Sequence, residues 1–211
     1  MDADDTAALK QDLVWEERLA GRTLTLSSTW GLFSPKRLDD GTRLLIDHLQ
    51  APAAGMCLDL GCGYGAIGLA LACRCPQGQV HLVDKDFVAV TYADRNARRN
   101  GLHNCVAYLS NGFSHVPPRR FDVIATNLPA KVGAEMLTIL LTDARDHLAP
   151  GGALYVVALS GLKDYVKRSF RALFGNYEKV KQGQTYTVSR ACRDDDAATH
   201  AGQGGDGTRA C

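Results

Sequence analysis

Short apolar runs alternate with segments of helical spacing through most of the chain after residue 55. The runs are typical of buried strands, and the segments between them carry apolar residues three or four positions apart, as one face of a helix does. The expected strands cover residues 56–60, 80–83, 105–109, 121–125 and 153–158, and the expected helices cover residues 66–73, 87–99, 134–148 and 163–174. This alternation predicts an α/β fold, a doubly wound and mostly parallel sheet with helices on both faces.

The end of this pattern predicts a different kind of pairing. After the last helix, a turn at 174–177 leads into two more strands, about 177–181 and 184–190, which are joined at Gln182-Gly183. Two strands joined by so short a connection pair antiparallel. The sheet is therefore expected to have seven strands and an antiparallel terminal hairpin.

The two ends of the chain lack the alternation. Residues 5–20 are compatible with a short helix, and the strict alternation of Thr23 to Ser27 predicts a half-buried strand. Residues 193–211 contain no Leu, Ile, Val, Phe, Met, Tyr or Trp, so they have nothing to bury. We expect a helix/strand cap over 1–50, a core over 51–190 and a disordered tail over 191–211.

Composition limits the classes of partner and compartment. With 24 Lys and Arg against 23 Asp and Glu, the net charge of +1 gives no global field for a polyanion or a membrane surface. Seven cysteines, an odd number mostly inside apolar runs, do not resemble a secreted disulfide scaffold. No metal is expected, because Cys73 and Cys75 lack a second pair. With neither an apolar leader nor a run long enough to span a membrane, the protein is predicted to be cytoplasmic.

A glycine-rich segment stands between the first α/β strand and the helix after it, with the letters D-L-G-C-G-Y-G over residues 59–65. Glycines let the backbone turn with positive φ and approach a ligand, which the amides at a helix N-terminus then contact. Read as G-x-G-x-x-A from Gly61, the letters also fit a dinucleotide fingerprint, which requires an acid about 20 residues further on. Asp84 supplies that acid.

Asp59 distinguishes the two cofactor classes. A carboxylate just before the loop repels a pyrophosphate at the helix N-terminus, but it favours a cofactor with a positively charged amino group and sulfur. S-adenosylmethionine has both charges. The sequence therefore favours methyl transfer, and a nicotinamide oxidoreductase is a lesser alternative.

The D-L-G-C-G-Y-G segment resembles the first motif of the Rossmann-like, class I methyltransferases. By that resemblance, Asp84 with the adjacent Lys85 binds the ribose hydroxyls, and the segment after the third strand meets the adenine, whose edge suits an Asn side chain. The cofactor-binding residues so implied are Asp59, Gly61, Cys62, Gly63, Tyr64, Gly65, Asp84, Lys85, Ser110, Asn111 and Gly112. Plain turns and, at Asp84, a helix cap are the structural alternatives.

A second motif follows the fourth strand, where Asn127-Leu128-Pro129-Ala130 resembles the N-P-P-aromatic motif of methyltransferases that act on planar amines. In that motif the Asn oxygen and the next carbonyl accept both N–H bonds of the amine and aim its lone pair at the methyl group. By the resemblance, Asn127, Leu128 and Pro129 are catalytic and Asn127 also borders the cofactor. Ala130 stands where the stacking aromatic residue would be. A turn without catalytic role is the alternative.

Together with L-F-S-P at 32–35, L-D-D-G-T at 38–42 and L-A-P-G-G-A-L at 148–154, these motifs resemble the small methyltransferase-domain family over about residues 24–190. That family includes guanine-N2 methyltransferases of small-subunit ribosomal RNA and single-domain relatives. The resemblance implies a Rossmann-like methyltransferase sheet, and it places Gly41 and Thr42 over the methionine end of the cofactor.

The substrate class is less sharply defined. RNA is the leading candidate, with a planar nitrogen of a guanine-like base as acceptor, and Lys36-Arg37 are expected to contact phosphate near the substrate mouth. A methyltransferase for a small molecule or a protein side chain is the first alternative. The second alternative is a catalytically silent cofactor-binding or RNA-binding module, because the N-L-P-A motif lacks the first proline and the aromatic residue of the motif it resembles.

Overall fold

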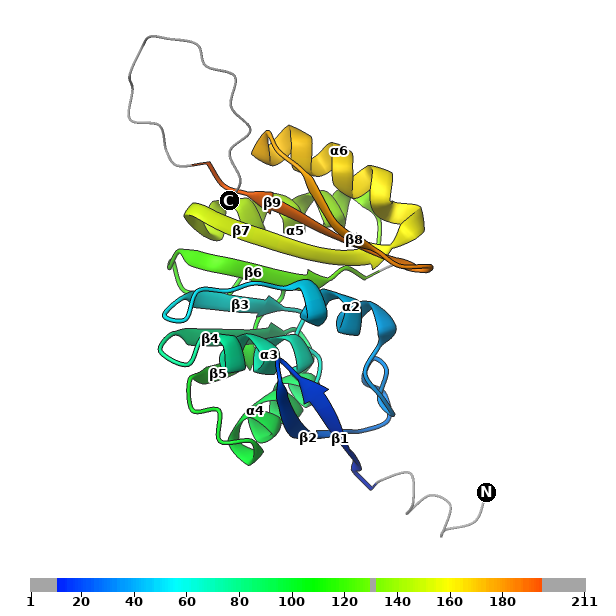
Figure 1. The fold of residues 1–211 in the computed structure, drawn as a ribbon, viewed down its shortest axis with the longest axis vertical. Coiled ribbons are helices and arrows are strands. Elements are labelled where there is room, and N and C mark those ends of the chain that lie inside the picture. Colours follow the sequence, from blue (N-terminus) through cyan, green and yellow to red (C-terminus); the bar gives the residue numbers. More distant parts are fainter. Residues whose placement is uncertain (1–10, 130–131, 195–211) are drawn as a thin grey trace.

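A seven-stranded sheet forms the centre of the computed structural model, which describes residues 11–129 and 132–194 (Figure 1). The strands lie in the order β5-β4-β3-β6-β7-β9-β8. Their bounds are β3 Met56–Leu60, β4 Gln79–Asp84, β5 Cys105–Leu109, β6 Phe121–Asn127, β7 Leu148–Leu159, β8 Glu178–Gln182 and β9 Tyr186–Cys192. The first five are parallel, and β9 runs antiparallel to both β7 and β8. The predicted fold class and the terminal hairpin are confirmed.

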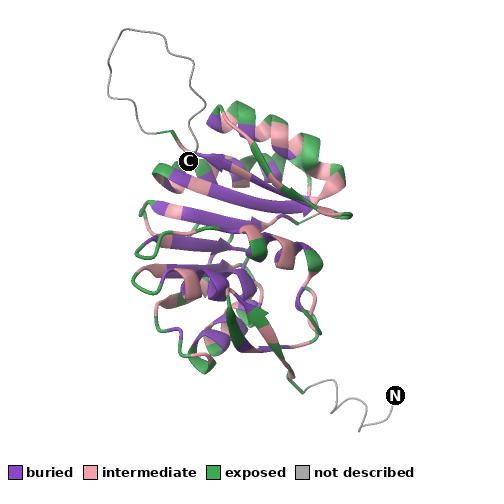
Figure 2. Ribbon diagram, viewed as in Figure 1, coloured by how far each residue is buried: buried purple, intermediate pink, exposed green. Residues whose placement is uncertain are grey.

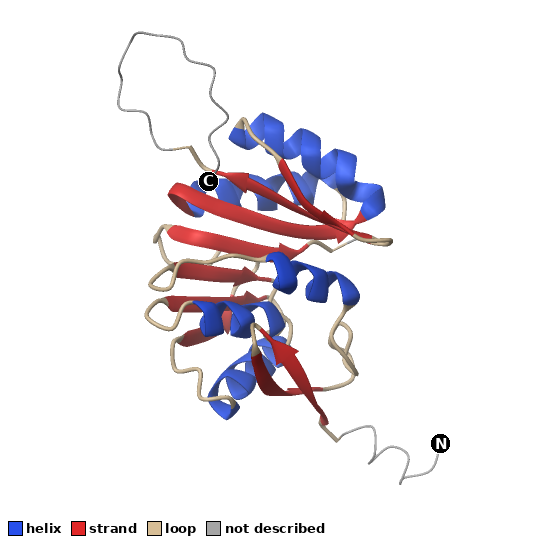
Figure 3. Cartoon of the chain, viewed as in Figure 1, coloured by secondary structure: helices blue, strands red, loops and turns tan. Residues whose placement is uncertain are grey.

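Helices cover both faces of this sheet (Figure 3). The helices are α2 Asp40–His48, α3 Ala66–Arg74, α4 Phe87–Arg99, α5 Ala134–His147 and α6 Lys163–Phe174, with a short 3₁₀ turn η1 at Ser160–Leu162. Apolar residues of α2, α3 and α4 form one core, and those of α5 and α6 form a second. Adjacent residues of β3 show the division, since Cys57 belongs to the first core and Leu58 to the second. Buried residues run along the strands, and exposed ones mark the outer helix faces (Figure 2).

The strand order reverses between β3 and β6. After β3 the chain proceeds to β4 and β5 on one side, and after β6 it proceeds to β7 on the other. In open sheets of this type a crevice forms beyond the carboxyl ends of the strands at such a switch point. The glycine-rich segment follows β3 and Asn127 ends β6, so both candidate motifs lie at this crevice.

The N-terminal segment forms a hairpin, and the helix expected over residues 5–20 is wrong for the part described. β1 (Leu13–Leu19) pairs antiparallel with β2 (Arg22–Ser28), and β2 is the strand predicted from alternation. Ala20 and Gly21, with φ of 49° and 80°, form the two-residue turn. Positive φ at both positions matches strand twist, so this turn favours a hairpin over a helix. Residues 5–10 lie outside the described part of the chain.

Asn96 of α4 and Asn100, which caps the C-terminus of this helix, attach the hairpin to the main body. The Asn96 side chain accepts from the Ser27 amide (2.8 Å) and donates to the Ser27 carbonyl (2.8 Å). One helical turn later, Asn100 makes the same pair of bonds with Thr25, each 2.9 Å long. The side-chain amides thus satisfy backbone groups along the edge of β2 that no other strand in the described residues covers.

The predicted domain boundaries need two corrections. β9 continues to Cys192, and Arg193 exchanges backbone hydrogen bonds with Gly151 and Gly152 (2.8 and 2.9 Å), so a tail beginning at 191 starts too early. At the other end, α2 packs on β7 and β9, so it belongs to the main body and not to a separate cap. The rest of the expected tail, residues 195–211, lies outside the described residues.

In the described part of the chain, no helix is long and apolar enough to cross a membrane. The same residues contain no group of three or more His, Cys, Asp and Glu side chains arranged to hold a metal ion.

Candidate active site

The glycine loop after β3 is held by the end of β4. The amides of Gly61 and Cys62 both donate to the Val83 carbonyl at 2.9 Å. Gly61, Gly63 and Gly65 have φ of 74°, 54° and 96°, a region that favours glycine. A Cβ added at Gly61 or Gly63 would meet no atom within 4 Å, so the backbone there faces open space. The loop therefore forms a backbone-lined cradle at the carboxyl edge of the sheet.

Asp59 supports this loop from beneath. Its side chain has 0% exposure, and its Oδ2 accepts from the Gly68 amide of α3 at 2.7 Å. Burial raises the pKa of the Asp59 carboxyl to about 7, with Asp84 adding to the rise and the Gly68 hydrogen bond opposing it. The prediction that this carboxylate lies beside a positively charged cofactor is therefore corrected: Asp59 has no surface to offer a ligand and instead fixes the start of α3.

Asp84, at the end of β4, is oriented toward the cradle. Its Oδ2 accepts from the Gly63 amide at 3.0 Å, and its Oδ1 accepts from the Asp86 amide at 3.0 Å. The expected alternative role as a helix cap falls to Asp86, whose side chain accepts from the Val88 amide. Each Asp84 oxygen keeps a free lone pair, so the carboxylate can still accept from two adjacent hydroxyl groups. Lys85 follows it and is exposed.

Two other loop residues named from the motif have structural contacts. The Tyr64 ring is 5% exposed, packs edge-on against Trp15, and its hydroxyl donates to the Arg37 carbonyl at 3.3 Å. Cys62 is buried, and that burial raises the pKa of its thiol. Their side chains therefore shape the loop and its link to the β2–α2 segment.

The segment after β5 borders the same edge. Ser110 is buried, and its hydroxyl donates to the Gly112 carbonyl (2.7 Å) while accepting from the His115 amide (3.0 Å). Gly112 has a φ of 57°. These contacts set a tight turn that leaves the Asn111 side chain exposed. Of the three predicted adenine contacts, Asn111 alone presents a free side chain.

Asn127 is held by residues from a distant part of the chain. Its Nδ2 donates to Asp39 Oδ2 and to Thr42 Oγ1, both at 3.0 Å. Asp39 is also the N-cap of α2 through the Thr42 amide (2.9 Å), and its Oδ1 accepts from the Tyr186 hydroxyl of β9 (3.1 Å). No described residue donates to Asn127 Oδ1, and that atom is not among the buried polar atoms without a partner. The amide oxygen therefore faces accessible space.

Gly41 and Thr42 take part in this arrangement by different means. A Cβ added at Gly41 would lie 2.6 Å from the Tyr186 ring, so only glycine permits this close contact between α2 and β9. Thr42 contributes its hydroxyl to Asn127. Both lie beside the candidate catalytic residue, and their expected contact with a cofactor stays a prediction.

The other residues of the N-L-P-A motif, which follow Asn127, differ in how far they are exposed. The Leu128 side chain is 4% exposed and belongs to the core formed with α5 and α6, and its amide donates to the Val157 carbonyl. Pro129 is exposed. Ala130 lies outside the described residues. Leu128 can therefore contribute only its backbone to a site.

The segment between β2 and α2 runs along the carboxyl edge of the sheet (Figure 1) and carries exposed aromatic and basic side chains. Phe33 is 65% exposed and Trp30 42% exposed, and Lys36 Nζ lies 4.7 Å above the Trp30 ring. The segment ends at Asp39, which accepts a hydrogen bond from Asn127, so these exposed side chains lie on the chain that leads into the site. An open aromatic face beside cations is typical of single-stranded nucleic acid binding.

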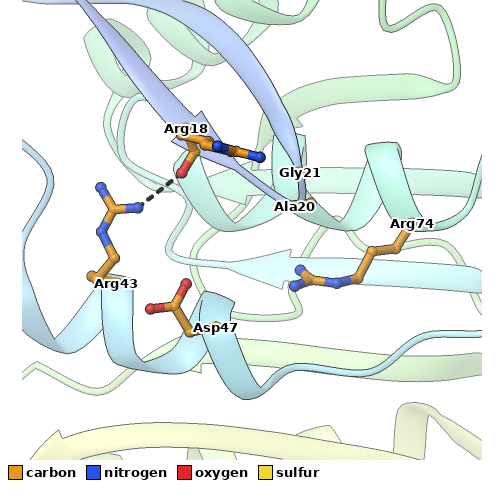
Figure 4. Close-up of a pocket in the computed structure, with 6 residues that line it drawn as sticks. All are labelled: Arg18, Ala20, Gly21, Arg43, Asp47 and Arg74. Atoms are coloured by element: carbon orange, nitrogen blue, oxygen red, sulfur yellow. Dashed lines mark hydrogen bonds between the residues drawn. The ribbon is translucent and has the colours of Figure 1, made fainter.

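A cavity of about 430 Å³ lies at the other end of α3 (Figure 4) and is lined by Arg18, Ala20, Gly21, Arg43, Asp47 and Arg74. Arg43 is committed to Glu17 (2.5 Å) and the Arg18 carbonyl (2.9 Å). In this view Asp47 lies between the guanidinium groups of Arg43 and Arg74. The cavity is a full helix length, about 13 Å, from the glycine loop. Its opposed charges do not define an anion site.

The sequence motifs missed two members of the site, Asp39 and Tyr186. Asp39 carried a local signal, because an Asp three residues before a Thr at a helix start is a capping pattern. Tyr186 carried none, since its contact with Asp39 spans 147 residues. Only the antiparallel placement of β9 beside β7 brings it there.

Residues 23–190 match the family model "Methyltransferase small domain". Among curated proteins, "Uncharacterized protein YbxB" of Bacillus subtilis is 38% identical over 181 residues, covering 84% of this chain and 90% of that protein. Ribosomal RNA large subunit methyltransferase G of Streptomyces avermitilis is 35% identical, covering 83% of this chain and 46% of that protein. Ribosomal RNA small subunit methyltransferase C of Pseudomonas entomophila is 34% identical, with coverages of 81% and 51%.

Solved structures give the same grouping. The T. thermophilus 16S rRNA N2 G1207 methyltransferase (RsmC), in complex with AdoMet and guanosine, superposes with a TM-score of 0.78 at 28% identity, covering 86% of this chain and 50% of that chain. A methyltransferase from Pyrococcus furiosus has a TM-score of 0.61 at 26% identity, with coverages of 78% and 90%. The chain thus spans about half the length of the rRNA methyltransferases that it matches.

A doubly wound sheet with a glycine cradle at its switch point and an anchored Asn at the neighbouring strand end defines the class as the Rossmann-like methyltransferases. The chain belongs to the methyltransferase small domain family. The resemblance inferred from its motifs is confirmed.

Proposed function

We propose that the protein transfers a methyl group from S-adenosylmethionine to a planar, exocyclic nitrogen of a guanine-like base in RNA. The observation that carries the proposal is the position of Asn127, whose amide nitrogen is anchored and whose oxygen is left free beside the glycine cradle. An acceptor at that position binds an N–H of the substrate amine and directs the nitrogen lone pair into the crevice.

The residues of the cradle fit the proposed cofactor. The open backbone at Gly61 and Gly63 admits a ligand, and Asp84 at its rim offers a carboxylate to the two ribose hydroxyls. S-adenosylmethionine supplies an electrophilic methyl group at its sulfonium. Gly61, Gly63 and Gly65 would hold it through close backbone approach, Asp84 through hydrogen bonds, and Asn111 through its exposed side chain at the adenine edge.

RNA as the substrate is supported by two separate facts. The relatives named above include rRNA methyltransferases, one of them solved with guanosine. The segment before Asp39 presents Trp30, Phe33 and Lys36 at the same edge as the site, and Phe33 offers a stacking surface that the N-L-P-A motif lacks. An RNA substrate would place the protein in the cytoplasm.

Methyl transfer is tested with isotope-labelled S-adenosylmethionine and deproteinised rRNA from cells that lack this gene, followed by digestion to nucleosides and mass spectrometry. We expect label in a guanosine methylated at the exocyclic nitrogen, and about a hundredfold slower labelling with the Asn127→Ala variant. Label in protein or in small molecules, but not in RNA, would favour the first alternative substrate class. Adenosylhomocysteine binding without label in any fraction would favour the silent module.

A further inference from the structure

We propose that Asp39 is a positioning residue, which fixes the Asn127 amide so that its oxygen, and not its NH₂ group, faces the substrate amine. This inference deepens the proposed function and rests on it. It is drawn from the hydrogen bonds that join the β2–α2 segment, β6 and β9 at one point.

The chemistry of Asp39 determines the orientation of the amide. An ionised carboxylate accepts hydrogen bonds and cannot donate them, so the atom of Asn127 that lies 3.0 Å from Asp39 Oδ2 must be the nitrogen. Its second hydrogen is directed to Thr42 Oγ1, also at 3.0 Å. With both hydrogens used, rotating the amide by 180° would set its oxygen against the carboxylate, which is repulsive.

Asp39 is itself held by donors on every side. The Thr42 amide and Asn127 Nδ2 both donate to Oδ2, and the Tyr186 hydroxyl donates to Oδ1. Burial raises the pKa of Tyr186, and the charge of Asp39 raises it further, so the phenol keeps the proton that it donates. The position of Asp39 at the N-terminus of α2 also favours its negative charge.

A capping role alone does not require this arrangement. Ser, Thr or Asn satisfies a helix N-cap about as well as Asp. The bonds to Asn127 and Tyr186 are additional to the cap, and they connect strand ends that the cap does not touch. An acid is needed only because three donors converge and because the amide must not turn.

The consequence concerns the reacting nitrogen. If the Asn127 amide turned, its NH₂ group would meet the NH₂ group of the substrate, and two donors cannot bond. The fixed oxygen accepts instead, and the neighbouring negative charge of Asp39 polarises the amide toward a stronger acceptor. Asp39 thus acts through Asn127 without touching the substrate.

The first experiment compares Asp39→Asn with Asp40→Asn, the same chemical change at the adjacent, exposed residue. We expect Asp39→Asn to lower kcat about tenfold or more while the Kd for adenosylhomocysteine changes less than twofold, because misorientation of a reacting group affects the rate. Asp40→Asn is expected to retain kcat. Equal kcat in the two variants would overturn the proposal.

Exchanging the acid and the amide between residues 39 and 127 distinguishes a positioning role of Asp39 from a role in folding. Asn127→Asp alone sets two carboxylates about 3 Å apart, which repel each other. In the double variant with Asp39→Asn, the new amide donates to the new carboxylate at the cost of the cap bond from the Thr42 amide, and the other carboxylate oxygen still accepts from the substrate. We expect the double variant to exceed both single variants in kcat. Additive losses would contradict the proposal.

The NMR signals of the Asn127 side-chain amide report its hydrogen bonds without any enzyme assay. They therefore test the role of Asp39 separately from the proposed function. The side-chain NH₂ signals of Asn127 in a ¹⁵N spectrum are identified by their loss in Asn127→Ala. We expect Asp39→Asn to shift or broaden them and Asp40→Asn to leave them in place. Unmoved signals in Asp39→Asn overturn the anchoring. Shifted signals in a protein that methylates no RNA support the anchoring, and in that case only the proposed function fails.

Discussion

The two halves of the site are built by different means. The cofactor half, Gly61 to Gly65 with Asp84, takes its shape from backbone turns and amides within two consecutive strand ends. The amine half, Asp39, Thr42, Asn127 and Tyr186, takes its shape from side-chain hydrogen bonds between segments that lie 85 to 147 residues apart. Changes in the first half should therefore affect binding or folding, and changes in the second should affect turnover.

The largest expected effect concerns Asp59, beneath the cofactor half. Because burial raises the pKa of its carboxyl to about 7, the folded protein retains a proton that the unfolded chain releases above about pH 4. The free energy of unfolding should therefore fall as the pH rises from about 4 to about 7, by up to roughly 4 kcal/mol at about 1.4 kcal/mol per pH unit.

Asp59→Asn removes this dependence and keeps an acceptor for the Gly68 amide. Urea titrations of both proteins at intervals between pH 4 and 8 measure the difference. The variant should be the more stable protein near pH 8, with adenosylhomocysteine affinity close to that of the parent. If the two proteins show parallel pH profiles, Asp59 is not buried as a neutral acid.

A change in the amine half should lower turnover and leave cofactor binding intact. Asn127→Ala removes the acceptor that orients the amine, so kcat for RNA should fall about a hundredfold. Calorimetric affinity for adenosylhomocysteine should remain within twofold of the parent value. A loss of affinity equal to the loss in rate would mean that Asn127 belongs to the cofactor half.

The third prediction concerns the rim of the cradle. Asp84→Ala removes charge-assisted bonds to ribose worth about 1.5–3 kcal/mol, so the Kd for adenosylhomocysteine should rise about ten- to a hundredfold. Asp86→Ala is the matched control, because it removes only the cap of α4 and should lower stability by about 1 kcal/mol without changing the Kd. Similar Kd values for the two variants would remove Asp84 from the site.

The smallest expected effect belongs to the exposed side chains of the β2–α2 segment before Asp39, which are members of neither half. Phe33→Ala removes an exposed stacking surface worth about 1 kcal/mol or more, so the KM for RNA should rise about fivefold, with kcat and cofactor affinity retained. Lys36→Ala should weaken RNA binding and reduce its salt dependence. Unchanged RNA affinity in both variants would place the substrate at another surface.

The same contrast explains what the sequence could predict. The strand-loop-helix pattern and the glycine loop are contiguous, so local periodicity and positive-φ chemistry were enough to predict the sheet, its hairpin and the cradle. The N-terminal hairpin was missed because Ala20-Gly21 is a weak turn signal and the hairpin is completed by Asn96 and Asn100, in and just after a distant helix.

Asp59 shows the other limit of sequence reasoning. Its place before the loop led to the prediction of a charged carboxylate beside the cofactor, but the burial that makes it a structural acid depends on tertiary packing. Tyr186 was not predictable for a similar reason, because its partner Asp39 is reached only through the sheet order. Composition and spacing cannot report either environment.

The central claim, that the cofactor half binds the cofactor with its reactive sulfur facing the amine half, is tested most directly by a crystal structure with adenosylhomocysteine. The account predicts a ligand lying across Gly61 and Gly63, with its ribose hydroxyls on the Asp84 carboxylate and its sulfur toward Asn127 Oδ1. A ligand whose ribose does not contact Asp84, or whose sulfur points away from Asn127, would contradict it.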